Sequence, residues 1–222
     1  MQSGIAVHGD VTVEVVRAPH AEWYRNLWAL ALPHVGLPRE VNVWRVRNLW
    51  HLWRGLWRIL VAYTFGIPTH FGALYVEVLR ANGQRIRYGM ASLRVVTTTG
   101  AGFIVDAFQN IVELEIMKYH GIGTGTNAEA VGDTALQTES TTALNPDSTR
   151  ATGSLTEASA TVFRTVGTNT VDASVACTEH GILSQAATGG GTLIDRSVFS
   201  VINLASGDSI QTTYDLTIST GG

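Results

Sequence analysis

Residues 71–222 consist of short segments in which apolar and polar side chains alternate, separated by turns rich in glycine. Alternation with a period of two is typical of strands that bury one face. The clearest example is "LYVEVLRANGQRIRYGMASLRVVTTTG", where Asn82-Gly83 separates two such segments and favours the tight turn of a β-hairpin. Further strands are predicted on both sides of a turn at 167–169, at 192–198 with a continuation to 202 as the alternative, and at 209–219 after a turn at 206–208.

Residues 102–110 favour a short helix, and Val112, Leu114 and Ile116 alternate as in another strand. About seven strands at short spacing, without helices between them, are typical of an antiparallel β-sandwich or barrel. We therefore expect a mainly β fold for residues 71–222.

The first 70 residues differ in composition from the rest. All six tryptophans lie before residue 58, and residues 1–70 carry seven arginines against four acidic residues. Residues 71–222 carry eight Lys or Arg against fourteen acidic residues. The boundary falls near "GIPTHFG", whose glycines and proline suit a linker. We predict a helical Trp/Arg-rich segment at 1–70 that serves docking or oligomerisation, followed by a β domain at 71–222.

Two helices are predicted in this N-terminal segment. "AEWYRNLWALAL" at 21–32 stops before Pro33, as helices commonly do. At 39–65 the apolar residues follow the i, i+3, i+4, i+7 spacing of one helix face. That face contains Val46, Leu49, Trp50, Trp53, Leu56, Trp57 and Leu60. Gly55 weakens the helix by about 1 kcal/mol relative to alanine, and the valines near its start leave a strand as the alternative there.

A basic helix rich in tryptophan can bury its apolar face in three ways. It can pack on its own domain, lie on a membrane surface through residues 39–65, or dock on a partner subunit. Trp and Arg dominate the binding energy of many interfaces. The partner-binding residues predicted for the third alternative are Trp50, Trp53, Trp57 and Arg54.

The composition excludes several kinds of partner and site. Cys177 is the only cysteine, so neither an intrachain disulfide nor a cysteine-rich zinc site is expected, and we interpret it as a small buried hydrophobe. Lys118 is the only lysine and the net charge is −3, which predicts no general affinity for nucleic acid. The N-terminus lacks the pattern of a signal peptide, and the chain lacks an apolar run long enough for a simple membrane span.

The segment "YHGIGTGTNAEAVGDTALQTE" at 119–139 has glycines at alternate positions, which is a feature of glycine-rich phosphate-binding loops. A P-loop, however, needs a lysine after its last glycine to reach the phosphates, and none follows Gly125. A dinucleotide fold needs G-x-G-x-x-G at the start of a helix, whereas the chain here is predicted to be β. We interpret the glycines as allowing a strand to bend into a long surface loop.

Candidate metal ligands and catalytic groups do not form a known pattern. Glu179 and His180 are neighbours on a predicted strand, so their side chains should point to opposite faces. The other candidate ligands are His120 and Asp195, and, for calcium in the long loop, Asp133, Glu139 and Asp147. They lack zinc or calcium spacing, and no G-x-S-x-G motif is present. We expect no metal, no cofactor and no enzymatic activity.

Three longer segments follow one another in a characteristic order. They are "RVVTTTGAGFIVDAFQN", "YHGIGTGTNAEAVGDTALQTE" and "TEHGILSQAATGGGTLIDRSVFSVINLASGDSIQTTYDLTI". In this order they resemble small structural proteins of tailed bacteriophages, over residues 75–220. The Trp-rich segment at 19–65 is not part of the resemblance.

This resemblance implies a β-sandwich that is located in the virion and has no catalytic residues. The first expectation is a capsid decoration (cement) protein that binds the major capsid protein or other virion subunits and forms a homo-oligomer. The alternative is a tail-fibre or receptor-binding module, or another structural protein of the tail.

Overall fold

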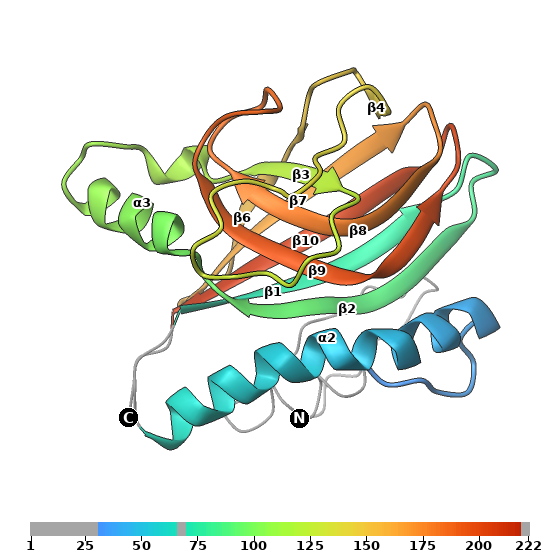
Figure 1. Ribbon diagram of the computed structural model, residues 1–222, viewed down its shortest axis with the longest axis horizontal. Helices are drawn as coiled ribbons and strands as arrows, with labels where there is room; N and C mark the ends of the chain where they lie inside the picture. The colour runs from blue at the N-terminus through green and yellow to red at the C-terminus, as the bar shows by residue number, and fades with distance from the viewer. Residues whose placement is uncertain (1–30, 66–69, 219–222) are drawn as a thin grey trace, which may run out of the picture.

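The computed structural model describes residues 31–65 and 70–218 (Figure 1). Its elements are α2 (Arg39–Thr64), β1 (His70–Leu79), β2 (Arg85–Val95), α3 (Thr98–Phe108), the 3-10 turn η1 (Leu114–Ile116), β3 (Tyr119–Gly123), β4 (Leu144–Asn145), β5 (Ala151–Thr152), β6 (Ser154–Ser159), β7 (Val162–Val171), β8 (Val175–Leu183), β9 (Leu193–Leu204) and β10 (Ser209–Ile218). The predicted helix at 21–32 lies almost wholly outside the described residues, as do Trp23 and Trp28.

Two open antiparallel sheets form the body of the protein, which confirms the β-sandwich and not the barrel (Figure 1). The first sheet has the order β2-β1-β10-β7-β4, with β6 also pairing with β7. The second sheet has the order β5-β3-β8-β9. The edge strands β2 and β9 lie near each other on one side of the sandwich.

The main hydrophobic core lies between the two sheets. It contains Leu74 of β1, Ile122 of β3, Ile182 of β8, Phe199 of β9 and Tyr214 of β10, each at most 2% exposed. These residues come from both sheets, as expected when each strand points alternate side chains inward. Burial of this apolar surface is the main force that holds the sheets together.

Several strand predictions are confirmed. β1 and β2 form the predicted antiparallel hairpin, and Gly83 has a φ of 86°, a conformation that glycine adopts without strain. The predicted strands near the C-terminus are β9 and β10. The short helix is α3, which begins after Thr97, whose hydroxyl caps the backbone N–H of Gly100.

Two other strand predictions are wrong. Residues 112–116 include the 3-10 turn η1, and no described strand pairs with them. The predicted turn at 167–169 lies inside β7, which pairs with β10 through this stretch. Gly167 is needed there for close packing: an added Cβ would lie 2.5 Å from Cδ2 of His120. This glycine therefore marks contact between the sheets and not a turn.

Helix α2 packs against the side of the sandwich where β2 and β9 meet (Figure 1). Val41 and Trp44, in its first turns, reach the main core between the sheets. Further along, Leu52, Leu56 and Ile59 form a second apolar cluster with residues of β1 and β2. The helix and the strands thus share buried surface, and α2 begins as a helix at Arg39 despite the valines near its start.

Candidate partner-binding surface

Helix α2 covers the open side of the sandwich through buried polar side chains. Asn48 is fully buried and bridges the two edge strands. Its Nδ2 donates to the Ala91 carbonyl of β2 (2.8 Å), and its Oδ1 accepts from the Ser200 backbone N–H of β9 (2.9 Å). Trp44 Nε1 donates to the Ser200 carbonyl (2.7 Å). Backbone groups that an uncovered strand edge would offer to another chain are satisfied here by the helix.

Strand β2 is irregular at the two places where α2 binds it. Its pairing with β1 skips Tyr88 and Ala91, as in β-bulges. The Ala91 carbonyl accepts from Asn48, and the Tyr88 carbonyl accepts from Nε of Arg45 (3.0 Å). Since a bulge leaves the extra residue out of the ladder, these two side chains supply the partners that β1 does not.

Helix α2 also touches the backbone of β2 at Gly55. A Cβ at this position would overlap the Leu93 carbonyl and would lie 2.7 Å from Nη1 of Arg94. The Arg94 guanidinium donates to the His51 carbonyl of the helix (2.7 Å) and pairs with Glu129 from the loop after β3. Burial lowers the pKa of Arg94 to about 10. The helix, β2 and the loop are therefore tied together at one point.

This close approach predicts that Gly55→Ala destabilises the protein although alanine is the better helix former. The added methyl gains about 1 kcal/mol of helix propensity, but it forces α2 away from Leu93, and overpacking typically costs about 1–3 kcal/mol. We expect a net loss of up to about 2 kcal/mol in the free energy of unfolding in urea.

Gly102 of α3 provides the matched control for this substitution. An added Cβ at Gly102 meets nothing within 4 Å. Gly102→Ala should therefore stabilise the protein by about 0.5–1 kcal/mol. A Gly55→Ala variant as stable as Gly102→Ala would contradict the close contact between α2 and β2.

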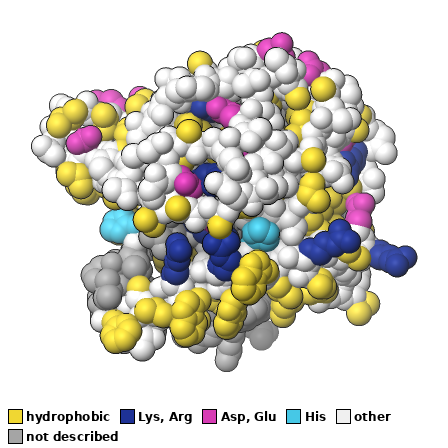
Figure 2. Space-filling model, in the orientation of Figure 1, with side chains coloured by type: hydrophobic (Ala, Val, Ile, Leu, Met, Phe, Trp, Pro, Cys, Tyr) yellow, Lys and Arg dark blue, Asp and Glu magenta, His cyan; other side chains and the backbone are white. Residues whose placement is uncertain are grey.

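The three tryptophans predicted to bind a partner lie on the exposed side of α2. Trp50 is 65% exposed, Trp53 51% and Trp57 57%, and the rings of Trp53 and Trp57 stack with their centroids 6.4 Å apart. In Figure 2, yellow side chains run along the lower edge, over α2, with dark-blue arginine or lysine side chains just above them. Arg54, predicted to act with the tryptophans, is half-buried on the same helix.

The apolar face predicted from the sequence is mostly not the face that packs on the sandwich. Of its seven residues only Leu56 is buried, whereas Val46 and Leu60 are exposed along with the three tryptophans. The helix is held by another face, on which Arg45 and Asn48 lie among apolar side chains. Hydropathy alone ranks these two residues as outward-facing, because it takes no account of the hydrogen bonds that allow them to be buried.

An apolar groove of about 360 Å³ lies beside the tryptophans. Trp50 and Trp53 form one wall, and Leu32 and Leu93 contribute to the others. Arg47 and Arg58 are exposed nearby on the helix, and no described carboxylate forms an ion pair with either. We call Trp50, Trp53, Trp57, Arg54 and Arg58, together with this groove, the Trp/Arg stripe. Aromatic and arginine side chains around a hollow are typical of residues that dominate protein–protein binding.

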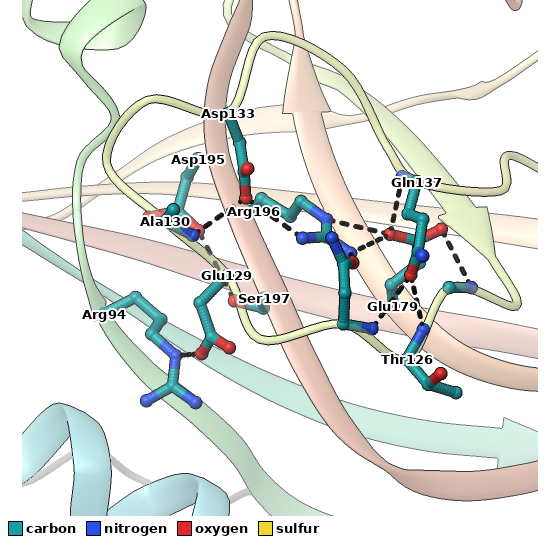
Figure 3. Close-up of polar contacts among 12 residues, drawn as sticks. Arg94, Thr126, Glu129, Ala130, Asp133, Gln137, Glu179, Asp195, Arg196 and Ser197 are labelled. Carbon is teal, nitrogen blue, oxygen red and sulfur yellow. Dashed lines mark hydrogen bonds and ion pairs between the residues drawn. The ribbon is translucent and has the colours of Figure 1, made fainter.

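The glycine-rich loop after β3 is built around a carboxylate of the protein itself (Figure 3). Glu179 of β8 accepts hydrogen bonds from the backbone N–H groups of Gly125 (3.0 Å), Gln137 (3.0 Å) and Thr138 (2.7 Å). An added Cβ at Gly125 would lie 2.5 Å from the same carboxylate. The backbone donors that would hold a phosphate in a nucleotide site are thus occupied by Glu179, and the glycine allows close approach.

Two arginines bind carboxylates of this loop. Arg196 of β9 donates to Glu179 (2.7 Å), to Asp133 (3.0 Å) and to the side-chain oxygen of Asn127 (2.6 Å). Arg150 pairs with Glu139 in the same way. Asp133 and Glu139, which the sequence offered as calcium ligands, are therefore bound to arginines.

Four of the other candidate groups lie inside the sandwich, namely His120, Cys177, His180 and Asp195, whereas Asp147 is exposed in the long loop. Glu179 and His180 point to opposite faces of β8, as predicted, because Glu179 meets the loop while His180 contacts His120. Cys177 is fully buried, and burial raises the pKa of its thiol to about 12. Asp195 is also buried, and burial raises the pKa of its carboxyl to about 7. The two histidines contact each other between the sheets.

Within residues 31–65 and 70–218, no three His, Cys, Asp or Glu side chains are grouped so that they could hold a metal ion. None of the described helices has both the length and the apolar character needed to cross a bilayer. No protein-family pattern and no curated protein matches the sequence.

Proposed function

We propose that this protein is a structural subunit of a viral particle, a β-sandwich that decorates the capsid of a tailed bacteriophage and docks through the Trp/Arg stripe. The observation that carries this proposal is the orientation of α2. Its other face is fixed to both edge strands by Trp44, Arg45 and Asn48, so the three tryptophans are presented on a rigid support. A rigid aromatic surface binds with little loss of conformational entropy.

The rest of the described protein supports a structural role. Its buried ion pairs hold its own loop and strands together, as with Glu179 and Arg196. Partially exposed tryptophans on the stripe offer apolar area whose burial contributes about 25 cal/mol per Å². In a symmetric particle such contacts repeat over many copies, so a modest contact is sufficient for stable attachment. A tail subunit would use the same kind of surface, and is the alternative within this class.

The proposal predicts that Trp53→Ala combined with Trp57→Ala weakens attachment to the particle without unfolding the sandwich. Both side chains are more than half exposed and stack mainly on each other, so their loss leaves the core intact. Because tryptophan anchors often contribute about 2 kcal/mol or more each, we expect occupancy to fall at least about tenfold. The measurement is the amount of chain on density-banded particles, with circular dichroism to verify folding.

Leu155→Ala on β6 is the matched control, since Leu155 is 38% exposed and lies away from α2. This variant should occupy particles like the wild type. Equal occupancy of the tryptophan variant would contradict the proposed docking role. Absence of the wild-type chain from particles would contradict the virion function itself.

A further inference from the structure

A second exposed apolar surface lies on the segment from α3 to η1, which projects from one end of the sandwich (Figure 1). Phe108 is 81% exposed, Ile111 64%, Val105 53% and Leu114 44%. We call these four residues, with the acidic residues Asp106, Glu113 and Glu115, the knob. In Figure 2 the projection carries yellow side chains with magenta ones among them. Apolar side chains grouped on a projection are typical of a binding surface.

The knob and the Trp/Arg stripe carry opposite charges. Asp106, Glu113 and Glu115 lie on the knob, and no described arginine or lysine forms an ion pair with them. Helix α2 carries five arginines and only one acidic residue. Surfaces of opposite charge attract each other during encounter and favour the correct orientation.

We propose that the knob of one copy of this protein docks on the Trp/Arg stripe of a second copy. The inference rests on the proposed function and names the partner of the stripe as the protein itself. Phe108, at the end of α3, is the side chain that enters the apolar groove lined by Trp50 and Trp53. The glutamates at 113 and 115 then face Arg54 and Arg58.

The groove has room for this arrangement. Its volume of about 360 Å³ is at the lower end of the range for pockets that take a small ligand. An aromatic side chain that moves from water into such a groove buries about 150–250 Å². Its walls are apolar side chains, and the charged groups of both surfaces lie at the rim, as in most protein interfaces.

The two surfaces belong to different elements of the molecule, so the contact joins unlike patches. Such a contact closes into a ring or a reciprocal pair when the rotation between copies allows it, and otherwise extends into a filament. We expect the contact to bury less than the roughly 800 Å² per partner of a standard interface, because the knob offers only four apolar side chains. We therefore expect a single contact to be weak, with micromolar association that weakens as salt rises and strengthens when several contacts close together.

The test uses charge reversal on the full chain. The stripe variant carries Arg54→Glu and Arg58→Glu, and the knob variant carries Glu113→Arg and Glu115→Arg. All four positions are exposed or half-buried, so the sandwich should fold in each variant. Mass is measured by light scattering and sedimentation over a range of concentrations. We expect the wild type to associate and each variant alone to lose at least tenfold in association.

Mixing then distinguishes a knob–stripe contact from general changes in charge. The reversed stripe of one variant matches the reversed knob of the other, so an equimolar mixture should associate again. A single chain that carries all four substitutions should also recover association. The proposal is supported if association recovers in both cases while each variant alone does not associate.

Three results would overturn it. One is wild-type association that the knob variant leaves unchanged. Another is failure of the mixture and of the four-substitution chain to recover. The third is a wild-type chain that stays monomeric at all concentrations tested; cosedimentation with vesicles of phosphatidylcholine and phosphatidylserine would then show whether a membrane takes the place of the second copy.

Failure of this inference is distinguishable from failure of the proposed function. If the wild type is monomeric but Trp53→Ala with Trp57→Ala still removes the chain from particles, the stripe binds another virion subunit and the proposed function stands. If the chain is absent from particles yet associates through the knob, the contact between copies is supported and the virion function is contradicted.

Discussion

Glu179→Gln is expected to destabilise the protein by about 3–5 kcal/mol, because it breaks a buried ion pair and leaves Arg196 without its main partner. Glu179 is fully buried and Arg196 is 1% exposed at its side chain. The amide keeps the size of the side chain but replaces one acceptor oxygen by a donor. That donor would face either the guanidinium or the backbone N–H groups of Gly125, Gln137 and Thr138.

The effect should appear in two measurements. Urea denaturation gives the loss of stability, and limited proteolysis should show new cleavage between residues 124 and 138, because this loop loses its anchor. Glu157→Gln on β6 is the matched control, since Glu157 is exposed and its substitution should change stability by less than about 0.5 kcal/mol. A loss as small as the control's would mean that the loop does not depend on the carboxylate.

Acid is expected to destabilise the sandwich below pH 6.5 through two buried histidines. His120 Nδ1 lies 3.0 Å from His180 Nε2 and 2.8 Å from the Thr212 hydroxyl, between the two sheets. Burial lowers the pKa of His120 to about 3, and burial together with His120 holds the pKa of His180 well below its usual value. Below pH 6.5 the unfolded chain therefore binds protons that the folded protein does not, and stability falls by about 1.4 kcal/mol per pH unit for each histidine.

Asp195 has the opposite effect on the pH dependence of stability. Burial raises the pKa of its carboxyl to about 7, so between pH 7 and about 4 the folded protein takes up a proton that the unfolded chain does not. As the pH falls, this proton uptake stabilises the folded protein by about as much as one of the histidines destabilises it. The three groups together should then cost roughly 2.7 kcal/mol between pH 6.5 and 4.5.

Variants separate these contributions through the slope of stability against pH. His120→Gln should flatten the slope between pH 6.5 and 4.5, even if it lowers stability at pH 7. Asp195→Asn should make the slope steeper, because the compensating proton is lost. His70→Gln is the control, since His70 is exposed. A wild-type stability that is constant over this range, or a slope that His120→Gln leaves unchanged, would contradict neutral buried histidines.

The sequence was sufficient for the fold class because local patterns and tertiary structure agree over most strands. The Asn82-Gly83 hairpin and the C-terminal strands follow from alternation and turn chemistry alone. The pattern failed where glycine serves packing between elements. Gly167 was interpreted as a turn and Gly55 as a weak point of a helix, but each marks a place where a side chain or carbonyl from another element approaches. Such contacts join residues far apart in sequence, so no local window contains them.

The sequence predicts the tryptophan-bearing face of α2, but it does not predict which face of the helix packs on the sandwich. A second face of the helix, with Val41, Trp44, Asn48, Leu52 and Ile59, also has helical spacing, and it is this face that packs. Choosing it requires knowing that β2 has bulges whose carbonyls need partners. Part of the knob is missed for a related reason, because Leu114 lies in the stretch 112–116, which alternates like a strand although no described strand pairs with it.

The ties between α2 and the strands have a consequence for the timing of biosynthesis. The hydrogen bond from Trp44 to the Ser200 carbonyl joins residues 156 positions apart, and Asn48 reaches the same strand. The ribosome therefore completes the residues of α2 long before it synthesises β9. Until then, both faces of this tryptophan-rich segment are exposed to solvent. Such a nascent chain is a natural client for chaperones that bind apolar segments. The tryptophans acquire their fixed orientation only after synthesis has passed Ser200, so folding must precede any ordered association of this chain.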